Sequence, residues 1–169
     1  MLDTAVAAAL PKAKRDPDVV IELPGFVKGK GRPRSRIATG RGGQQFVAVY
    51  TDSETRSYEA MLRFAGEQAM RQNDNRTRLP FECALRVRVT AVFVVPKSRS
   101  RRDTEQSLAG IIRPTGKPDC DNILKCVGDS LNGVVWRDDS IIVDLMIRKF
   151  YGIHPMLLIE VWRFLGTML

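Results

Sequence analysis

The chain has 169 residues, and its 27 lysines and arginines outnumber its 19 aspartates and glutamates, so its formal net charge is +8. This length suits a single domain with its own hydrophobic core. The sequence contains no apolar run near the roughly 18 residues of a membrane-spanning helix, and its single histidine excludes a site built on two histidines. The excess positive charge indicates an acidic partner, most often nucleic acid. Charge that serves only solubility is the alternative.

The N-terminal stretch bears on location and domain organisation. Residues 1–18 show no strand or helix periodicity, and we expect a flexible tail ahead of a folded domain that comprises residues 19–169. Asp3 stands where a secretory signal peptide would carry positive charge, and the odd count of three cysteines argues against a disulfide framework. We therefore expect a cytoplasmic protein that does not associate with a membrane.

The domain is predicted to begin with a strand and a basic loop. Apolar residues alternate over 19–23 and end at Pro24-Gly25, which is typical of a strand followed by a turn. The glycine-rich loop over 27–43 either binds phosphates or is ordinary solvated surface, and a short strand is expected over 46–50. The basic residues of this loop are Lys28, Lys30, Arg32, Arg34, Arg36 and Arg41.

A helix, a strand and a second basic loop are expected next. Thr51 and Glu54 fit a capping box at the start of a helix that ends near Arg71. Alternating residues over 85–93 predict a strand. The basic residues of the loop that follows are Lys97, Arg99, Arg101 and Arg102.

The last third of the chain is predicted to add a second helix and two strands. An apolar stripe over 123–131 predicts the helix, and alternation predicts strands over 141–147 and 157–161. The order of elements favours a single-domain α+β fold, in which a mixed or antiparallel β-sheet packs with two main helices.

A compact group of acids is the most informative feature. Asp119 and Asp121 precede Lys125, and Asp121 shares a helix face with Lys125 because the two are four residues apart. Asp138 and Asp139 stand just before the next strand. Carboxylates repel phosphates unless a metal ion such as Mg²⁺ bridges the two, and a nearby lysine would stabilise charge in the transition state. The plainer alternative is a helix cap with a salt bridge at the first two acids and a turn at the second two.

Three motifs resemble the signature of RusA-type Holliday-junction resolvases, which are small dimeric endodeoxyribonucleases of bacteria and their phages. The motifs are K-P-D-x-D-N-x-x-K, D-x-L-N-G and W-x-D-D, over residues 117–125, 129–133 and 136–139. Weaker similarities extend over 19–163, whereas Ile141 stands where members often have Gln. The resemblance implies a homodimer that nicks symmetrically related strands of a four-way DNA junction, in recombination and repair, in the cytoplasm of a bacterial cell or a phage-infected host.

The resemblance also implies roles for individual residues. Asp119, Asp121 and Asp139 are expected to be catalytic and to bind Mg²⁺, for which Mn²⁺ is a substitute. Lys125 is expected to be the essential lysine, and Asp138 is a secondary candidate for metal binding. The residues expected to bind DNA through their charge are Lys28, Lys30, Arg32, Arg34, Lys97, Arg99, Arg101, Arg102 and Lys117.

Two hypotheses compete with this one. The first is a basic DNA-binding protein that catalyses no reaction, and the second is a carboxylate nuclease that acts on other branched DNA or on RNA.

Overall fold

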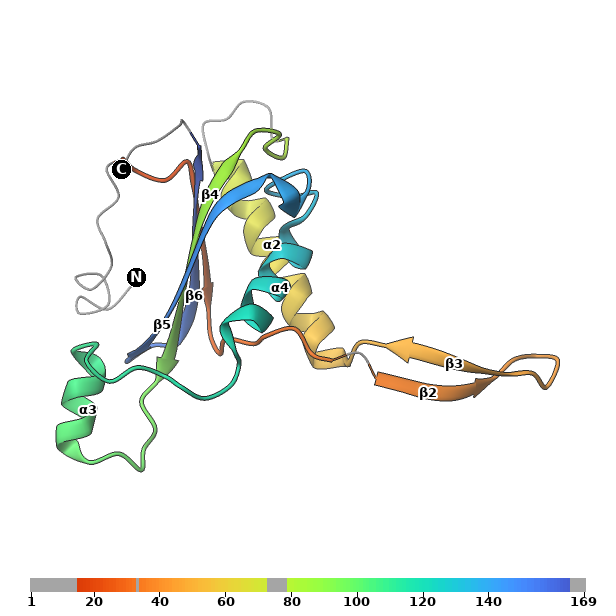
Figure 1. Ribbon diagram of the computed structural model, residues 1–169, viewed down its shortest axis with the longest axis horizontal. Coiled ribbons are helices and arrows are strands. Elements are labelled where there is room, and N and C mark those ends of the chain that lie inside the picture. The colour runs from red at the N-terminus through yellow and green to blue at the C-terminus, as the bar shows by residue number, and fades with distance from the viewer. Residues whose placement is uncertain (1–14, 33, 73–78, 165–169) are drawn as a thin grey trace.

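A four-stranded sheet forms the centre of the protein, and the computed structural model describes residues 15–32, 34–72 and 79–164 (Figure 1). The strands of this sheet are β1 (Val19–Pro24), β4 (Leu85–Val94), β5 (Ile142–Gly152) and β6 (Met156–Arg163). Their order across the sheet is β1-β6-β4-β5. The sheet is mixed because β4 runs parallel to β5, whereas β6 runs antiparallel to both β1 and β4.

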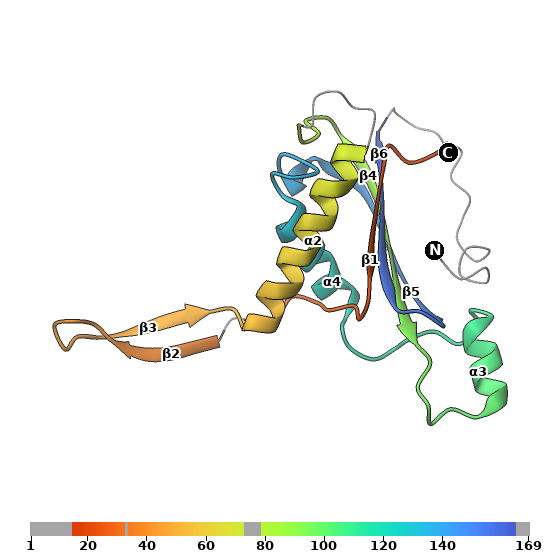
Figure 2. The same ribbon diagram turned by 180° about the vertical axis from the view of Figure 1, so that it is seen from behind.

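Two long helices cover one face of this sheet. They are α2 (Ser53–Gln72) and α4 (Cys120–Leu131), and both lie on the same side in the two opposite views (Figures 1 and 2). A shorter helix, α3 (Arg101–Leu108), lies beyond the end of the sheet, and a 3₁₀ turn, η1 (Asp139–Ile141), precedes β5. The predicted single-domain α+β fold is confirmed, and the two predicted main helices are α2 and α4.

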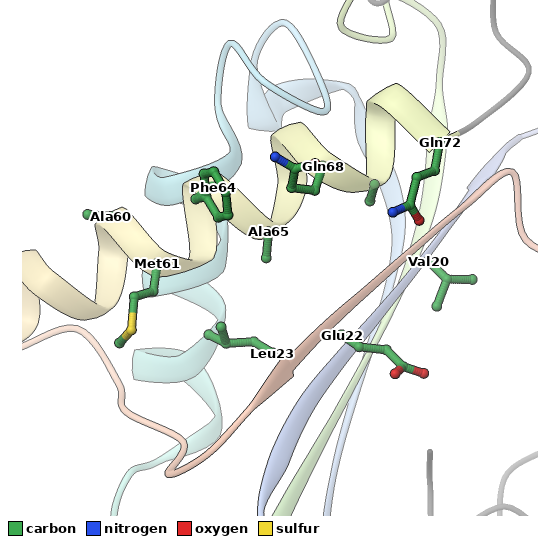
Figure 3. Close-up of a pocket in the computed structure, with 10 residues that line it drawn as sticks. Val20, Glu22, Leu23, Ala60, Met61, Phe64, Ala65, Gln68 and Gln72 are labelled. Carbon is green, nitrogen blue, oxygen red and sulfur yellow. The ribbon is translucent and has the colours of Figure 1, made fainter.

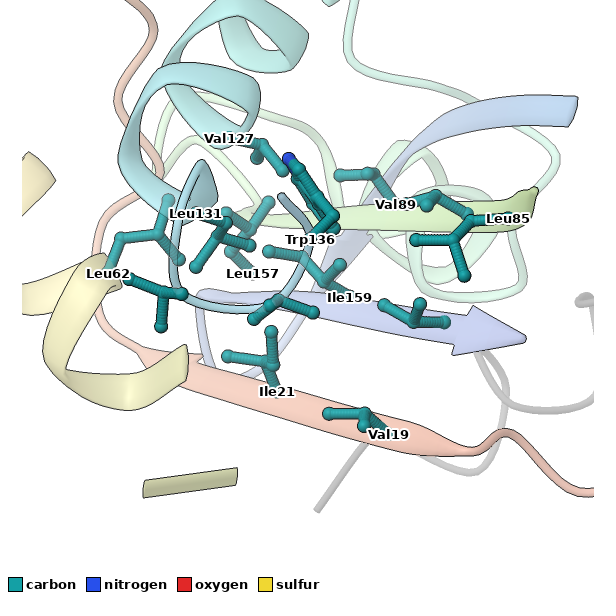
Figure 4. Packing of buried hydrophobic residues seen from close by; sticks show 14 of the residues in the cluster. Val19, Ile21, Leu62, Leu85, Val89, Val127, Leu131, Trp136, Leu157 and Ile159 are labelled. Carbon is teal, nitrogen blue, oxygen red and sulfur yellow. The ribbon is translucent and has the colours of Figure 1, made fainter. Parts of the chain in front are cut away.

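The hydrophobic core lies between these helices and the sheet. Leu62 of α2 and Leu131 of α4 meet Ile21 and Ile159 of the sheet, and Trp136 closes the cluster with no exposed surface (Figure 4). Full burial of a large apolar side chain contributes roughly 1.5–3 kcal/mol. The apolar stripe of each helix therefore fixes its position on the sheet.

Two strands that the sequence did not predict as a pair form a separate hairpin. They are β2 (Arg34–Thr39) and β3 (Gln45–Tyr50), which pair antiparallel and project away from the body of the protein (Figures 1 and 2). Residues 34–39 were expected to belong to a loop, and this prediction was wrong. The glycines and arginines of the segment indicated a loop more strongly than its weak alternation of polar and apolar residues indicated a strand. Only the strand over 46–50 was predicted.

The second basic loop is also shorter than predicted, because Arg101 and Arg102 form the first turn of α3. The sequence of α3 has no apolar stripe, and Ser107 is its one buried residue. Its start is fixed locally, since Asp103 N donates a hydrogen bond to Ser100 Oγ at 3.1 Å. Hydrophobic periodicity therefore could not predict α3.

The end of the predicted tail is attached to the sheet. Arg163 N donates a hydrogen bond to Asp18 Oδ2 at 2.8 Å, and the Trp162 indole donates one to the Arg15 carbonyl oxygen at 3.2 Å. Residues 15–18 are therefore part of the folded domain, whereas residues 1–14 of the predicted tail lie outside the described residues. Within the described ranges, none of the helices is both long and apolar enough to cross a membrane.

Candidate active site

Helix α4 presents the acids of the central motif on its exposed side. Ile123, Val127 and Leu131 are buried against the core, whereas Asp121 and Lys125 are exposed to solvent. This separation follows from the helical period, because residues three and four apart share a face. The buried stripe therefore determines which way the charged residues point.

Asp119 occupies the N-cap position of α4 without acting as a cap. Its backbone is extended, at φ −74° and ψ 156°, and its side chain makes no capping hydrogen bond. The carboxylate is exposed. The plain capping role weighed for Asp119 therefore has no support in its contacts, and its oxygens are available to bind a cation.

Asp121 and Lys125 form the expected i,i+4 ion pair. Lys125 Nζ lies 3.3 Å from Asp121 Oδ2, and about two thirds of each side chain is exposed, 64% and 65%. Exposed pairs of this kind contribute between about 0 and 1 kcal/mol. The pair is thus weak enough to open when a phosphate approaches the lysine.

Asp139 reaches α4 because the helix has a glycine opposite it. Asp139 Oδ2 lies 3.4 Å from the place that a Cβ atom on Gly128 would occupy. Lys125 and Asp139 also line one hollow of about 240 Å³ between α4 and the sheet. The turn after α4 therefore carries Asp139 to the helix beside Gly128, about one turn beyond Lys125 and about two turns beyond Asp121.

Asp138 has a structural partner. Ser140 N donates a hydrogen bond to Asp138 Oδ1 at 3.0 Å and so closes the turn at the start of η1. Hydrogen bonds from Ser140 lower the pKa of the Asp138 carboxyl. The turn role weighed for this residue is thus present, while Asp139 faces the helix.

The acids are spread along α4 and do not form a closed cage. Throughout the described ranges, no three His, Cys, Asp or Glu side chains are grouped closely enough to hold a metal ion. Mg²⁺ does not require such a group, because it usually keeps several waters and is bound through one or two carboxylates and substrate phosphates. The uncapped carboxylate of Asp119 and the exposed carboxylate of Asp121 suit a site of that kind, whereas Asp139 lies farther along α4, beside Gly128.

Two lysines that the motifs do not include position α4. Lys30 N donates to the Asn122 carbonyl oxygen at 2.8 Å, and its Nζ pairs with Glu59 at 2.7 Å and with Asp129 at 2.8 Å. Lys149 Nζ of β5 donates to the Pro118 carbonyl oxygen at 3.0 Å. Side chains from two distant segments therefore hold both ends of the motif, which no local pattern in the sequence reveals.

The pairing of Lys30 is strong enough to change its titration. Burial disfavours the charged ammonium, but hydrogen bonds to Asp129 and Glu59 outweigh burial, so the pKa of Lys30 is raised. Lys30 was predicted to bind DNA, and the structure shows it linking α2 to α4. Its side chain thus has a structural role whether or not it also meets a phosphate.

The other predicted DNA-binding residues fall into two groups. Lys28 pairs with Glu54, Arg101 pairs with Glu105, and the Arg99 guanidinium stacks 5.0 Å from the ring centre of Tyr151. The side chain of Arg34 is outside the described part of the structure. The remaining residues of the set, all exposed, are Arg32, Lys97, Arg102 and Lys117.

A larger groove elsewhere is a poor match for DNA. It encloses about 830 Å³ between α2 and the edge strand β1, and Val20, Met61 and Phe64 lie along it (Figure 3). None of the residues that line it is a lysine or an arginine. A phosphate backbone needs positive charge, so the smaller hollow beside Lys125 is the better candidate.

Comparison with known proteins gives two matches. The sequence model of a family described as Endodeoxyribonuclease RusA matches residues 24–162. An uncharacterized protein of Bacillus subtilis (strain 168), YqaN, is 30% identical over 126 residues, which cover 75% of this chain and 82% of that protein. The family match includes α2, α4, the turn with Asp139, strands β4 and β5 and nearly all of β6, whereas of β1 it includes only Pro24.

Proposed function

Because the chain belongs to the RusA family of endodeoxyribonucleases, we propose that it is a Mg²⁺-dependent endonuclease that resolves four-way DNA junctions. The proposal includes paired nicks made by a homodimer, a role in recombination and repair, and a location in the cytoplasm of a bacterial cell or a phage-infected host. The observation that carries it is the uncapped carboxylate of Asp119 beside the exposed Asp121–Lys125 pair. A helix that needed these acids only for stability would use the first as its cap.

Each residue of the cluster has a part in the proposed reaction. Asp119, Asp121 and Asp139 would hold the metal. A bound Mg²⁺, or Mn²⁺ in its place, activates water and neutralises charge on the phosphate. Lys125 lies against both Asp121 and the hollow that Asp139 lines. When a phosphate arrives, the lysine exchanges its weak pair with Asp121 for the developing negative charge on a phosphate oxygen.

Binding and chemistry divide between different parts of the surface. Lys97, Arg102, Lys117 and Arg32 are exposed cations, and such residues attract the phosphate backbone without reading its sequence. The carboxylates of the site repel the same backbone until a cation is bound. The basic residues would therefore bind DNA with or without the metal, and the metal would bring a phosphate to the acids.

Substitution of Asp121 by asparagine tests the proposal. Asp121→Asn keeps the size of the side chain and removes its charge, so we expect Mg²⁺-dependent nicking of a purified four-way junction to be lost while binding of the junction is kept. Glu67→Gln is the matched control, since Glu67 forms a comparable exposed i,i+4 pair with Arg63 at 3.6 Å on α2. Nicking by Asp121→Asn at the wild-type rate would contradict the proposal.

The substrate is tested by comparing DNA and RNA structures. Nicking is measured on a four-way junction, a flap, a linear duplex and an RNA duplex, each with and without Mg²⁺. We expect nicking of the junction only, in symmetrically related strands, together with a dimer mass in light scattering. Salt-sensitive binding without nicking of any substrate would instead favour the non-catalytic DNA-binding protein, and preferential nicking of flaps or RNA would favour a different nuclease.

A further inference from the structure

The hairpin of β2 and β3 is an arm with two unlike faces. Ala38 lies opposite Phe46 across the hairpin, and Ile37 lies opposite Val47. Since successive residues of a strand point to opposite faces, Phe46 and Ala38 share one face with Arg36. Ile37 and Val47 form the other face.

The arm carries positive charge only. From Phe26 to Thr51 the sequence contains no acidic residue. A segment of this kind is attracted to a polyanion. The basic residues of the arm itself are Arg34, Arg36 and Arg41, and Arg32 precedes it, whereas Lys28 and Lys30 of the same segment pair with acids of α2 and α4.

The arm also exposes apolar side chains far from the core. The exposed fractions are 71% for Ile37, 54% for Phe46 and 66% for Val47. Phe46 lies on one face of the hairpin, whereas Ile37 and Val47 lie on the other. An isolated two-stranded hairpin is at best marginally stable in water, and exposed apolar surface marks sites of interaction. The arm therefore has the character of a surface that is completed by a partner.

The surroundings of Phe46 suit a flat partner. Its cross-strand neighbour is the small Ala38, and a Cβ atom on Gly40 would lie 3.7 Å from Phe46 Cε1. Because these two neighbours are small and the Phe46 side chain is 54% exposed, the ring is accessible to a partner. Aromatic rings next to cations are the usual platform for unpaired bases, because every base has a π-face that stacks.

We propose that this arm binds the branch point of the DNA, with Phe46 stacked on the outer face of a base pair there and the arginines of the arm on the flanking phosphates. The inference rests on the proposed function, because stacking is interrupted at a branch point, whereas a base inside an intact duplex must first be unstacked. The arm thereby adds selectivity for branched DNA that the phosphate contacts alone do not give.

The test compares the two faces of the arm. Binding is measured without divalent metal, so that no cleavage occurs, on a four-way junction with 2-aminopurine at the branch point and on a linear duplex of the same arm sequence. Phe46→Ala is expected to weaken junction binding about 5- to 100-fold, to leave duplex binding nearly unchanged and to abolish quenching of the 2-aminopurine. Phe46→Trp is expected to restore both, and Val47→Thr, on the opposite face, is expected to bind as wild type does.

Several outcomes would overturn the inference. Equal loss in Phe46→Ala and Val47→Thr would show that only the fold of the arm matters. Equal loss on junction and duplex would place Phe46 on phosphates or grooves. A change in oligomer mass of Phe46→Ala in the absence of DNA would show that a second copy of the chain covers the arm.

The controls separate this inference from the proposed function. If the wild type does not prefer junctions, but Phe46→Ala still weakens its binding to single-stranded DNA, base stacking stands while the proposed function and the branch point fail. If neither effect is seen, both fail. If junctions are bound and nicked and Phe46→Ala behaves as wild type, only the role of the arm is wrong.

Discussion

Two helices of this protein begin with an aspartate, and the two carboxylates are used differently. At the start of α2, Asp52 accepts a hydrogen bond from Thr55 N at 2.9 Å and another from Thr55 Oγ1 at 2.7 Å. At the start of α4, Asp119 occupies the capping position and makes no capping hydrogen bond. The same residue type at the same place is a structural cap in one helix and makes no capping hydrogen bond in the other.

The difference between the two helix starts shows that α4 lacks the stability that a capping side chain would provide. A capping side chain typically contributes about 1 kcal/mol, and α4 does without it. Other contacts hold the helix instead, namely its buried stripe and the hydrogen bond from Lys30 N to the Asn122 carbonyl oxygen. A helix secured by tertiary contacts can leave its first acid without a capping hydrogen bond, as the proposed metal site would need.

The largest expected effect on nicking comes from replacing the uncapped aspartate at the start of α4. Asp119→Asn removes a proposed metal ligand but no capping bond, so we expect nicking of a four-way junction to fall on the order of 10²- to 10³-fold. The free energy of unfolding is expected to change by less than about 0.5 kcal/mol. Initial rates with saturating Mg²⁺ and thermal unfolding of the same sample measure the two quantities. A stability loss with nicking intact would mean that Asp119 is a cap after all.

A second large effect is expected at Gly128. A methyl group there meets Asp139 Oδ2 at 3.4 Å, which is ordinary contact, whereas the branched side chain of Gly128→Val displaces the carboxylate. Since a displacement of 1 Å costs roughly 10²-fold in rate, Gly128→Val is expected to lose about that much nicking activity. Gly128→Ala is the control and is expected to keep most of its activity while gaining up to about 1 kcal/mol in helix stability. Equal rates for the two variants would show that Asp139 need not approach α4.

The sequence was sufficient to predict the helices and strands whose apolar residues recur with a regular period. The stripe over 123–131 and the alternation over 85–93 predicted α4 and β4, because burial of one face imposes a period that the residues must follow. It also placed Asp121 and Lys125 on one face, and their ion pair confirms this. Family membership, inferred from the spacing of the acids, is confirmed by the match over residues 24–162.

The sequence was insufficient to predict contacts that depend on the path of a loop or on a choice between neighbouring polar residues. Thr51 and Glu54 fitted a capping box, yet Asp52 caps α2, because neighbouring polar residues compete for the same backbone N–H groups. The approach of Asp139 to Gly128 depends on how the turn after α4 folds back, and the pairing of Lys30 with Asp129 joins residues far apart along the chain. Their partners are fixed by tertiary packing, and local periodicity does not encode it.

A smaller effect, on stability alone, is expected at the aspartate that caps α2. Asp52→Ala removes the cap of α2, so the free energy of unfolding is expected to fall by about 1 kcal/mol, which lowers Tm by roughly 2–4 °C for a chain of this size. Nicking at 25 °C is expected to stay at the wild-type rate, since Asp52 is not part of the proposed site. Calorimetry and the junction assay check the two statements. Together with Asp119→Asn, this variant separates stability from activity at two equivalent positions.

The smallest effect is expected from the cation that precedes the start of α4. Lys117 is exposed and lies two residues before Asp119, so it is placed to meet a phosphate of the DNA that approaches the acids. Removal of one phosphate contact lowers the slope of log K against log salt by about 1. We therefore expect Lys117→Ala to reduce this slope for junction and duplex alike, without changing which substrate is nicked. Arg71→Ala, in the last turn of α2, is the control. An equal reduction of this slope in Arg71→Ala would mean that the net charge of the chain attracts DNA. A reduction confined to Lys117→Ala would mean that the phosphate backbone of the DNA lies at the start of α4.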